Sequence, residues 1–235
     1  MKKRSKKYNQ IKNKIDTNTN ISILESLDKV KELSTSNFKG SIEVHISTKI
    51  SKKENKQILR GSVYYKNKVG KNKKILLLTD QKDIKPETKK EFNYVGLDLY
   101  IKKIQEGWDD FDLVIASPSV MPKIAILGKI LGPKSLMPNP KLGTVTDDLE
   151  DIIKKYKGGK FDFKSDSNGT LHTIIGNIEN TKEELLENLI DLLKSFISVS
   201  GKSASILLKT IYVCPTMGPS IKIHNDELIK LLINS

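Results

Sequence analysis

Two lysines, Lys134 and Lys141, lie in a segment from 131 to 143 that is dense in proline and glycine. Proline fixes the backbone angle φ and glycine permits positive φ, so such a segment holds one defined shape. Lysines on a rigid loop can present point charges to a phosphate-bearing ligand. The sequence contains neither GxxxxGK[ST] nor GxGxxG, which excludes a Walker-type or dinucleotide-binding loop. A purely structural loop is the alternative interpretation, because proline and glycine mainly mark turns and breaks.

Five aspartates are the other candidates for catalytic residues. They lie near predicted helix starts and turns, where helix capping is their ordinary role. They are Asp109, Asp110, Asp112, Asp147 and Asp148. No partner base, Ser–His–Asp set or metal-ligand spacing accompanies them. The histidines at 45, 172 and 224 are far apart in the sequence, and each is predicted to be a surface or strand-end residue. We therefore predict no enzymatic activity, no metal and no cofactor.

The charge of the chain indicates a polyanionic partner. Its 235 residues include 41 basic and 28 acidic side chains, a net charge of +13, while 37% hydrophobic residues are enough for a folded core. Residues 1–14 are basic without an acid, which fits either a solvated tail or an arm on phosphates. There is no apolar segment of a signal peptide and no run near the roughly 20 residues that span a bilayer, so no membrane partner is expected. With one cysteine, Cys214, an intramolecular disulfide is excluded.

The two ends of the sequence have the patterns of an α+β layer. Near the start, a capping box at Ser22 predicts a helix over 22–34. Alternation predicts a half-buried strand over 42–50, and a second strand over 58–65 completes a predicted hairpin. Toward the end, the patterns predict a strand at 161–163, a turn at Asn168-Gly169 and a strand over 171–178. A helix from 181 and a loop at 200–205 are predicted next. A strand over 206–214, a turn at 215–219 and a helix after 225 complete the predicted elements.

The middle of the chain follows a different pattern. Residues 75–78 and 113–116 are short, continuous apolar runs, which are typical of parallel strands buried on both faces. Helical stretches are predicted at 85–91, 97–106, 121–131 and 146–157. This alternation favours an α/β unit.

The predicted fold class is therefore α/β and α+β in two domains. A discontinuous two-layer α+β domain, 1–68 with 159–235, is interrupted by a three-layer Rossmann-like α/β insert, 69–158. The insert has 16 basic and 13 acidic side chains, so the remainder carries +10 of the +13. If the protein binds RNA, the discontinuous domain should supply most of the electrostatic attraction.

The run LGKILGPKSLMPNPKLGTVT, residues 127–146, resembles the signature of the L-one family of large-subunit ribosomal proteins, the proteins of the mobile side stalk. The resemblance extends over nearly the whole chain. Further matches follow in order: Arg60-Gly61, Gly107-Trp108, Phe161-Asp162-Phe163-Lys164, Gly169-Thr170-Leu171-His172, Ile175-Gly176 and Thr216-Met217-Gly218-Pro219. It implies the same interrupted layout that periodicity and charge indicate.

The resemblance implies that the discontinuous domain binds large-subunit rRNA. The rRNA-binding residues that it implies are Phe38, Ser41, Glu43, Lys53, Lys56, Arg60, Lys164, Thr216, Met217 and Gly218. Small hydroxyls and a bare glycine allow close approach to ribose and phosphate, while a carboxylate can accept from a 2′-OH or a base amino group. Without the resemblance, Phe38 and Met217 would be interpreted as ordinary core residues. Lys134 and Lys141 are candidates to face tRNA.

Several residues depart from the family's pattern. Lys39, Gly40 and Ser41 stand where the family usually has an acidic residue, glutamate and threonine, and Lys164 stands for an arginine. A lysine keeps the charge but loses the two-pronged hydrogen bonding of arginine. Glu54 occupies a position that is commonly basic. These departures bear on the details of RNA contact, not on the family.

The resemblance implies a structural constituent of the large ribosomal subunit that assists release of deacylated tRNA from the exit site. Bacterial members of the family also repress translation of their own mRNA, so the cognate mRNA is a further candidate partner. A free RNA-binding translational regulator outside the ribosome is the alternative. Lysine, asparagine and isoleucine richness favours a ribosome in the plastid (chloroplast) stroma, with a bacterial cytoplasm as the alternative.

Overall fold

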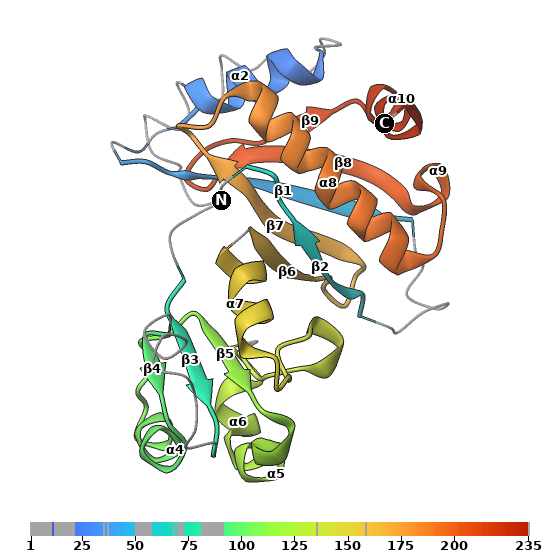
Figure 1. Ribbon diagram of the computed structural model, residues 1–235. Helices are drawn as coiled ribbons and strands as arrows, with labels where there is room; N and C mark the ends of the chain where they lie inside the picture. Colours follow the sequence, from blue (N-terminus) through green and yellow to red (C-terminus); the bar gives the residue numbers. More distant parts are fainter. Residues whose placement is uncertain are drawn as a thin grey trace. The chain divides into compact units, whose positions relative to one another are not determined.

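The computed structural model describes residues 11, 22–34, 36, 38–49, 58–67, 69, 73–80, 92–134, 136–157 and 159–234 (Figure 1). The chain divides into two compact units. We call Met1–Gly70 with Gly159–Ser235 the outer unit, and Lys71–Gly158 the insert. The predicted mixture of helices and sheets is confirmed. None of the helices in the described part is long and apolar enough to cross a membrane.

The outer unit is built on a four-stranded antiparallel sheet in the order β7-β1-β8-β9. Its strands are β1 (Ser41–Thr48), β7 (Thr170–Asn177), β8 (Leu208–Pro215) and β9 (Ile221–Ile223). Its helices are α2 (Ile23–Glu32), α8 (Lys182–Ser200), the short α9 (Ala204–Leu207) and α10 (Asn225–Asn234). The loop predicted at 200–205 ends before Ala204, where α9 begins. The strand predicted over 206–214 begins two residues later, because Ile206 and Leu207 belong to α9.

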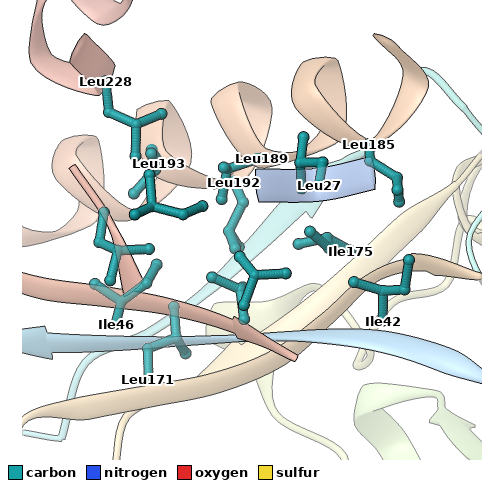
Figure 2. Close-up of a cluster of buried hydrophobic side chains, with 14 of the residues drawn as sticks. Leu27, Ile42, Ile46, Leu171, Ile175, Leu185, Leu189, Leu192, Leu193 and Leu228 are labelled. Carbon is teal, nitrogen blue, oxygen red and sulfur yellow. The ribbon is translucent and has the colours of Figure 1, made fainter. Parts of the chain in front are cut away.

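One face of this sheet is buried beneath α2 and α8. Residues alternate along β1, so Ile42, Val44 and Ile46 are buried while the residues between them are half-exposed. Figure 2 shows leucines of α8, among them Leu189 and Leu193, in one cluster with apolar residues of the sheet. The prediction of a strand with one buried face and one solvent-exposed face is confirmed.

Side-chain caps fix where the two long helices begin. Thr181 Oγ1 accepts from the Glu184 amide at 3.2 Å, and the Glu184 carboxylate accepts from the Thr181 amide at 3.2 Å. The Ser22 hydroxyl accepts from the Glu25 amide at 3.3 Å. Each cap satisfies amides that the first helical turn leaves without a partner, so both predicted helix starts are confirmed.

The predicted hairpin of 42–65 is wrong. Strand β2 (Arg60–Tyr64) pairs with β6 (Lys160–Lys164), whereas β1 pairs with β7 on one side and β8 on the other. A side chain at Gly61 would meet Val199 of α8 and Phe163 of β6, each at 2.7 Å from its Cβ. The missing side chain lets β2 lie directly against α8, and β6 supplies the hydrogen-bonding partner there.

The insert is built on a parallel sheet in the order β4-β3-β5. Its strands are β3 (Ile75–Leu78), β4 (Tyr94–Val95) and β5 (Leu113–Ala116). Leu76 and Leu78 pack into one apolar cluster, and Ile75 and Leu77 into another. Burial on both faces confirms what the continuous apolar runs predicted.

Helices cover both faces of that sheet. They are α4 (Asp98–Gln105), α5 (Met121–Ile124), α6 (Gly128–Leu131) and α7 (Leu149–Lys157), with short 3-10 turns at Pro118–Val120, Ala125–Leu127 and Pro140–Leu142. The predicted helices at 97–106 and 146–157 are confirmed, and that at 121–131 contains a 3-10 turn. The predicted helix at 85–91 lies outside the described residues.

Candidate nucleic-acid interface

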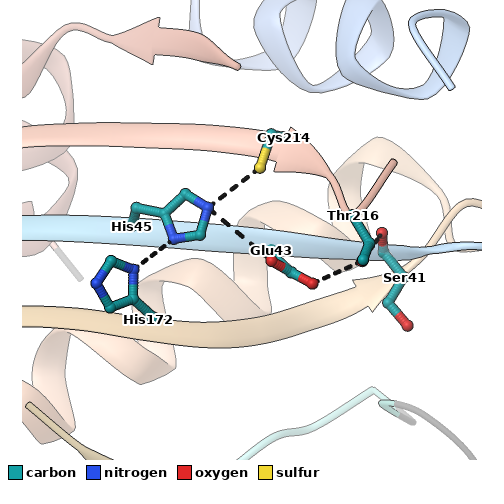
Figure 3. Close-up of polar contacts among 6 residues, drawn as sticks. All are labelled: Ser41, Glu43, His45, His172, Cys214 and Thr216. Carbon is teal, nitrogen blue, oxygen red and sulfur yellow. Dashed lines mark hydrogen bonds and ion pairs between the residues drawn. The ribbon is translucent and has the colours of Figure 1, made fainter. Parts of the chain in front are cut away.

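The start of β1 is joined to the turn after β8 by a small polar cluster (Figure 3). The Thr216 amide donates to the Ser41 carbonyl at 3.0 Å. The Thr216 hydroxyl lies 2.6 Å from Glu43 Oε1 and 3.2 Å from the Ser41 carbonyl oxygen, so its one proton is directed at two acceptors. The structure thus brings together three of the residues that the resemblance assigned to rRNA binding.

The turn at 215–218 requires a glycine. The Gly218 amide donates to the Pro215 carbonyl at 3.0 Å. A Cβ at Gly218 would lie 2.5 Å from Pro215 Cγ and 2.8 Å from the Leu33 carbonyl oxygen, which is too close for any carbon. The turn predicted at 215–219 is confirmed, and its backbone packs against the end of α2.

Phe38 and Met217 are exposed apolar side chains beside this cluster. Phe38 lies three residues before Ser41 and is 65% exposed, and Met217 follows Thr216 and is 60% exposed. An interpretation as core residues is therefore wrong. Exposed apolar groups next to polar groups can stack on bases, and this is how proteins commonly hold unpaired RNA.

Gly40 gives a structural reason for one departure from the family pattern. A Cβ at Gly40 would lie 3.1 Å from Ile178 Cδ1 and 3.4 Å from Ser36 Oγ. A glutamate at this position would require Ile178 to shift by a few tenths of an ångström. Glycine therefore fits the packing where β1 begins.

Two exposed cations face each other across the β2–β6 ribbon. Arg60 is the register partner of Lys164, and both are exposed. Cross-strand partners point to the same side of a sheet, so these two charges lie together. Lys53 and Lys56, the other cations predicted to bind rRNA, lie outside the described residues. The ribbon thus presents a pair of cations that can contact adjacent phosphates.

A second polar cluster lies on the half-exposed face of the sheet, and the sequence analysis missed it. His45 Nδ1 lies 2.8 Å from His172 Nδ1, and His45 Nε2 lies 3.2 Å from Cys214 Sγ and 3.9 Å from Glu43 Oε2. Burial, followed by the neighbouring His172, lowers the pKa of His45, while Glu43 acts in the opposite direction. Burial, with the Glu43 carboxylate, raises the pKa of the Cys214 thiol to about 11.

The lysines of the proline-rich segment are held differently. Lys134 Nζ pairs with Asp109 at 2.6 Å, with both side chains about half exposed. Lys141 lies in a 3-10 turn that the Asn139 side chain caps and that Gly143 ends at a φ of 70°. The described part of the segment thus includes a capped turn, and its rigidity stays a prediction. These lysines belong to the insert, separate from the residues of the outer unit.

Two of the five candidate aspartates, Asp110 and Asp112, bind groups of neighbouring segments in the insert. Asp110 pairs with Lys74 and accepts from the Tyr94 hydroxyl at 2.9 Å. Asp112 accepts from the Lys74 amide at 2.9 Å, where β3 begins. Ion pairs and backbone hydrogen bonds account for these two carboxylates without any catalytic role.

Known proteins resemble this chain over most of its length. The sequence model of the "Ribosomal protein L1p/L10e family" matches residues 30–219, most of the chain. The chain is also 37% identical over 232 residues to the large ribosomal subunit protein uL1 of Kosmotoga olearia, and the match covers 98% of this chain and all of that protein. The chain belongs to the ribosomal protein L1p/L10e family.

Proposed function

We propose that the outer unit binds large-subunit rRNA through the surface formed by Phe38, Ser41, Glu43 and the turn Thr216–Gly218. The observation that carries the proposal is the Thr216 hydroxyl held between Ser41 and Glu43, with two exposed apolar side chains beside it. Polar groups in fixed positions can read 2′-hydroxyls and base edges, and the apolar groups can stack. Membership of a ribosomal protein family supports rRNA as the ligand, and such a family is not enzymatic.

Arg60 and Lys164, on the β2–β6 ribbon of the same unit, are proposed to add phosphate contacts. Neither side chain forms an ion pair with another described residue, so both charges are available to a polyanion. Each phosphate contact releases counterions from the RNA and adds affinity that depends on salt. The polar turn therefore supplies preference for one RNA, and the two cations supply general affinity.

The test is binding of the full chain to a stalk rRNA fragment and to a scrambled RNA of equal length, at two salt concentrations. We expect the stalk fragment to bind far more tightly and to keep its advantage as salt rises. Thr216→Val and Met217→Ala should each reduce that preference. Ile206→Ala is the matched control, because Ile206 is also exposed (62%) and lies on α9. Equal binding of both RNAs, with equal loss in salt, would show that charge alone explains binding.

We further propose that the protein acts at the mobile side stalk and assists release of deacylated tRNA from the exit site, with Lys134 and Lys141 facing that tRNA. The capped 3-10 turn that carries Lys141 supports a role in positioning. Ribosomes carrying Lys134→Ala and Lys141→Ala together should release exit-site tRNA more slowly than wild-type ribosomes. An unchanged rate would remove these lysines from the proposal.

Repression of the cognate mRNA is a separate proposal that uses the same surface. It predicts that the leader of the protein's own mRNA binds better than a scrambled hairpin and competes with the stalk rRNA. The alternative, a free translational regulator, is distinguished by sedimentation. A ribosomal constituent travels with large subunits at physiological salt, whereas a free regulator remains in the supernatant.

For the compartment we propose a ribosome of the plastid stroma, with the bacterial cytoplasm as the alternative. The abundance of lysine, asparagine and isoleucine supports an AT-rich genome, and the relative described above is bacterial. Locating the gene on a plastid genome or on a bacterial chromosome decides between the two.

A further inference from the structure

Three side chains of types that can bind a metal ion, Glu43, His45 and Cys214, meet on the half-exposed face of the sheet (Figure 3). Glu43 and His45 are alternate residues of β1, so their side chains point to the same side. Cys214 of β8 is the register partner of Glu43. One carboxylate oxygen, one imidazole nitrogen and the thiol sulfur all lie within 4.8 Å of one another. Cys214 follows Glu43 by 171 positions in the sequence, and the three side chains still form one compact set of donor atoms.

The spacing of these donor atoms fits a small cation. Zinc binds sulfur at about 2.3 Å and nitrogen or oxygen at about 2.0–2.2 Å, so donors of a tetrahedral site lie roughly 3.3–3.8 Å apart. Here His45 Nε2 is 3.2 Å from Cys214 Sγ and 3.9 Å from Glu43 Oε2. A cation can therefore enter between the three with small side-chain rotations.

His172 lies where it can accept a hydrogen bond from the second ring nitrogen of His45. The two Nδ1 atoms of His45 and His172 are 2.8 Å apart, so one of them donates a proton to the other. When His45 Nδ1 donates, the lone pair of His45 Nε2 points toward Cys214 and Glu43. Metal-binding histidines commonly donate their second ring nitrogen to a neighbouring acceptor in this way.

The charges of the donor set balance a divalent cation. A thiolate and a carboxylate supply two negative charges, and neutral His45 supplies none, so the occupied site is neutral. Binding replaces the thiol proton, which leaves to solvent, and no oxidation or reduction is involved. His45 and Glu43 remain partly exposed, with 30% and 28% of their side-chain surface accessible, so a cation can reach the site.

We propose that Glu43, His45 and Cys214 form a three-ligand site for a divalent cation of the zinc class, with His172 as a positioning residue. Thiolate and imidazole ligands select zinc and its neighbours over magnesium or calcium, which prefer oxygen. Glu43 Oε1 accepts from Thr216, and Oε2 faces the site. One carboxylate therefore joins the cation site to the proposed rRNA surface.

The experiment uses Co²⁺ as a coloured substitute for zinc, added to the full-length, metal-free protein without RNA. Coordination by Cys214 gives a thiolate-to-cobalt charge-transfer band in the near ultraviolet, and Zn²⁺ should abolish it by competition. We expect one equivalent of Co²⁺ to saturate the band. Because RNA is absent, the result does not depend on whether the proposed rRNA surface is correct.

Variants separate a built site from adventitious binding. Cys214→Ser should remove the band, and His45→Gln should weaken zinc binding while circular dichroism shows a folded chain. His172→Phe keeps a ring but no acceptor, and should weaken zinc binding by about 10-fold. His224→Gln, a histidine outside the cluster, should change nothing. A folded protein without a thiolate band, or zinc affinity unchanged in both Cys214→Ser and His45→Gln, would overturn the proposal.

Discussion

The sheets of the two units differ in how much of their surface helices cover. In the outer unit, α2 and α8 cover the face that carries Ile42 and Val44, while Glu43 and His45 point to the other face and stay half-exposed. In the insert, every residue of β3 is buried, because helices cover both faces of the sheet. A sheet with one accessible face can use strand residues to contact a ligand, whereas a fully covered sheet can use only its loops.

Ion pairs occur in both units, and in the outer unit Lys39 pairs with Glu179 and Lys182 with Asp28. The cations proposed to bind RNA differ between the units. In the insert, Lys134 pairs with Asp109 and Lys123 pairs with Asp80. In the outer unit, Arg60 and Lys164 stand side by side without an ion pair to any described residue. Surface ion pairs stabilise little but do neutralise charge locally. The comparison supports the proposal that rRNA binds to the outer unit.

The largest predicted effect separates the cores of the two units. Leu189→Ala removes a fully buried side chain from α8 and should destabilise the outer unit by about 2–5 kcal/mol, with loss of rRNA binding. Leu76→Ala should destabilise the insert by a similar amount and leave stalk rRNA affinity nearly unchanged. Hydrogen exchange resolved by segment, with a binding assay, measures both. Loss of rRNA affinity in Leu76→Ala would contradict the proposal that rRNA binds to the outer unit.

A smaller effect is predicted at the turn after β8. In Gly218→Ala the new Cβ meets Pro215 and the Leu33 carbonyl, so the turn must shift at a cost of about 1–3 kcal/mol. The rRNA preference should fall with it, because Thr216 moves away from Glu43. Gly128→Ala is the matched control: a Cβ there meets no side chain within 4 Å, so alanine should fit without displacing a neighbour. Equal rRNA binding by both variants would contradict the role of the turn.

Local signals in the sequence predicted most elements, because they depend on neighbouring residues. The capping box at Ser22 marked the start of α2, and the apolar run at 75–78 marked a strand buried on both faces. The hairpin of 42–65 failed because strand pairing depends on distant residues: β1 takes β7 and β8 as partners. Short-range sequence patterns do not show which of several distant strands will pair with a given strand.

The candidate site shows the same limit. The resemblance supplied Thr216 and Glu43, but neither composition nor spacing indicated that they share a hydrogen bond. His45, His172 and Cys214 come together only through the register of β1 with its two neighbours. Of these three residues, only His45 had a usable signal in the sequence. The alternation along 42–50 places it on the half-exposed face of the strand.

A still smaller effect is predicted for the helix caps. Thr181→Ala removes the acceptor for the Glu184 amide and should destabilise α8 by about 1 kcal/mol. Helix α4 of the insert begins at Asp98, and its N-cap residue Leu97 forms no side-chain cap, so a change at Leu97 offers no equivalent loss. Faster hydrogen exchange confined to the first turn of α8 would confirm the assignment. Unchanged exchange there would mean that packing alone holds the helix end.

The smallest effect is predicted for the ion pair of the insert. Asp109→Asn breaks the pair with Lys134 and should change stability by less than about 1 kcal/mol, since both side chains are exposed. Thermal unfolding of the variant at low and high salt measures it. A large loss of stability would show that this pair holds the proline-rich segment in place.

The most direct test of the central claim compares two double variants by the salt dependence of their binding to the stalk rRNA fragment. Arg60→Ala with Lys164→Ala should weaken binding and reduce the slope of log affinity against log salt by about one unit or more, as expected when phosphate contacts are lost. Lys134→Ala with Lys141→Ala should leave both affinity and slope unchanged. The reverse result, a reduced slope only for the insert variant, would contradict rRNA binding by the outer unit.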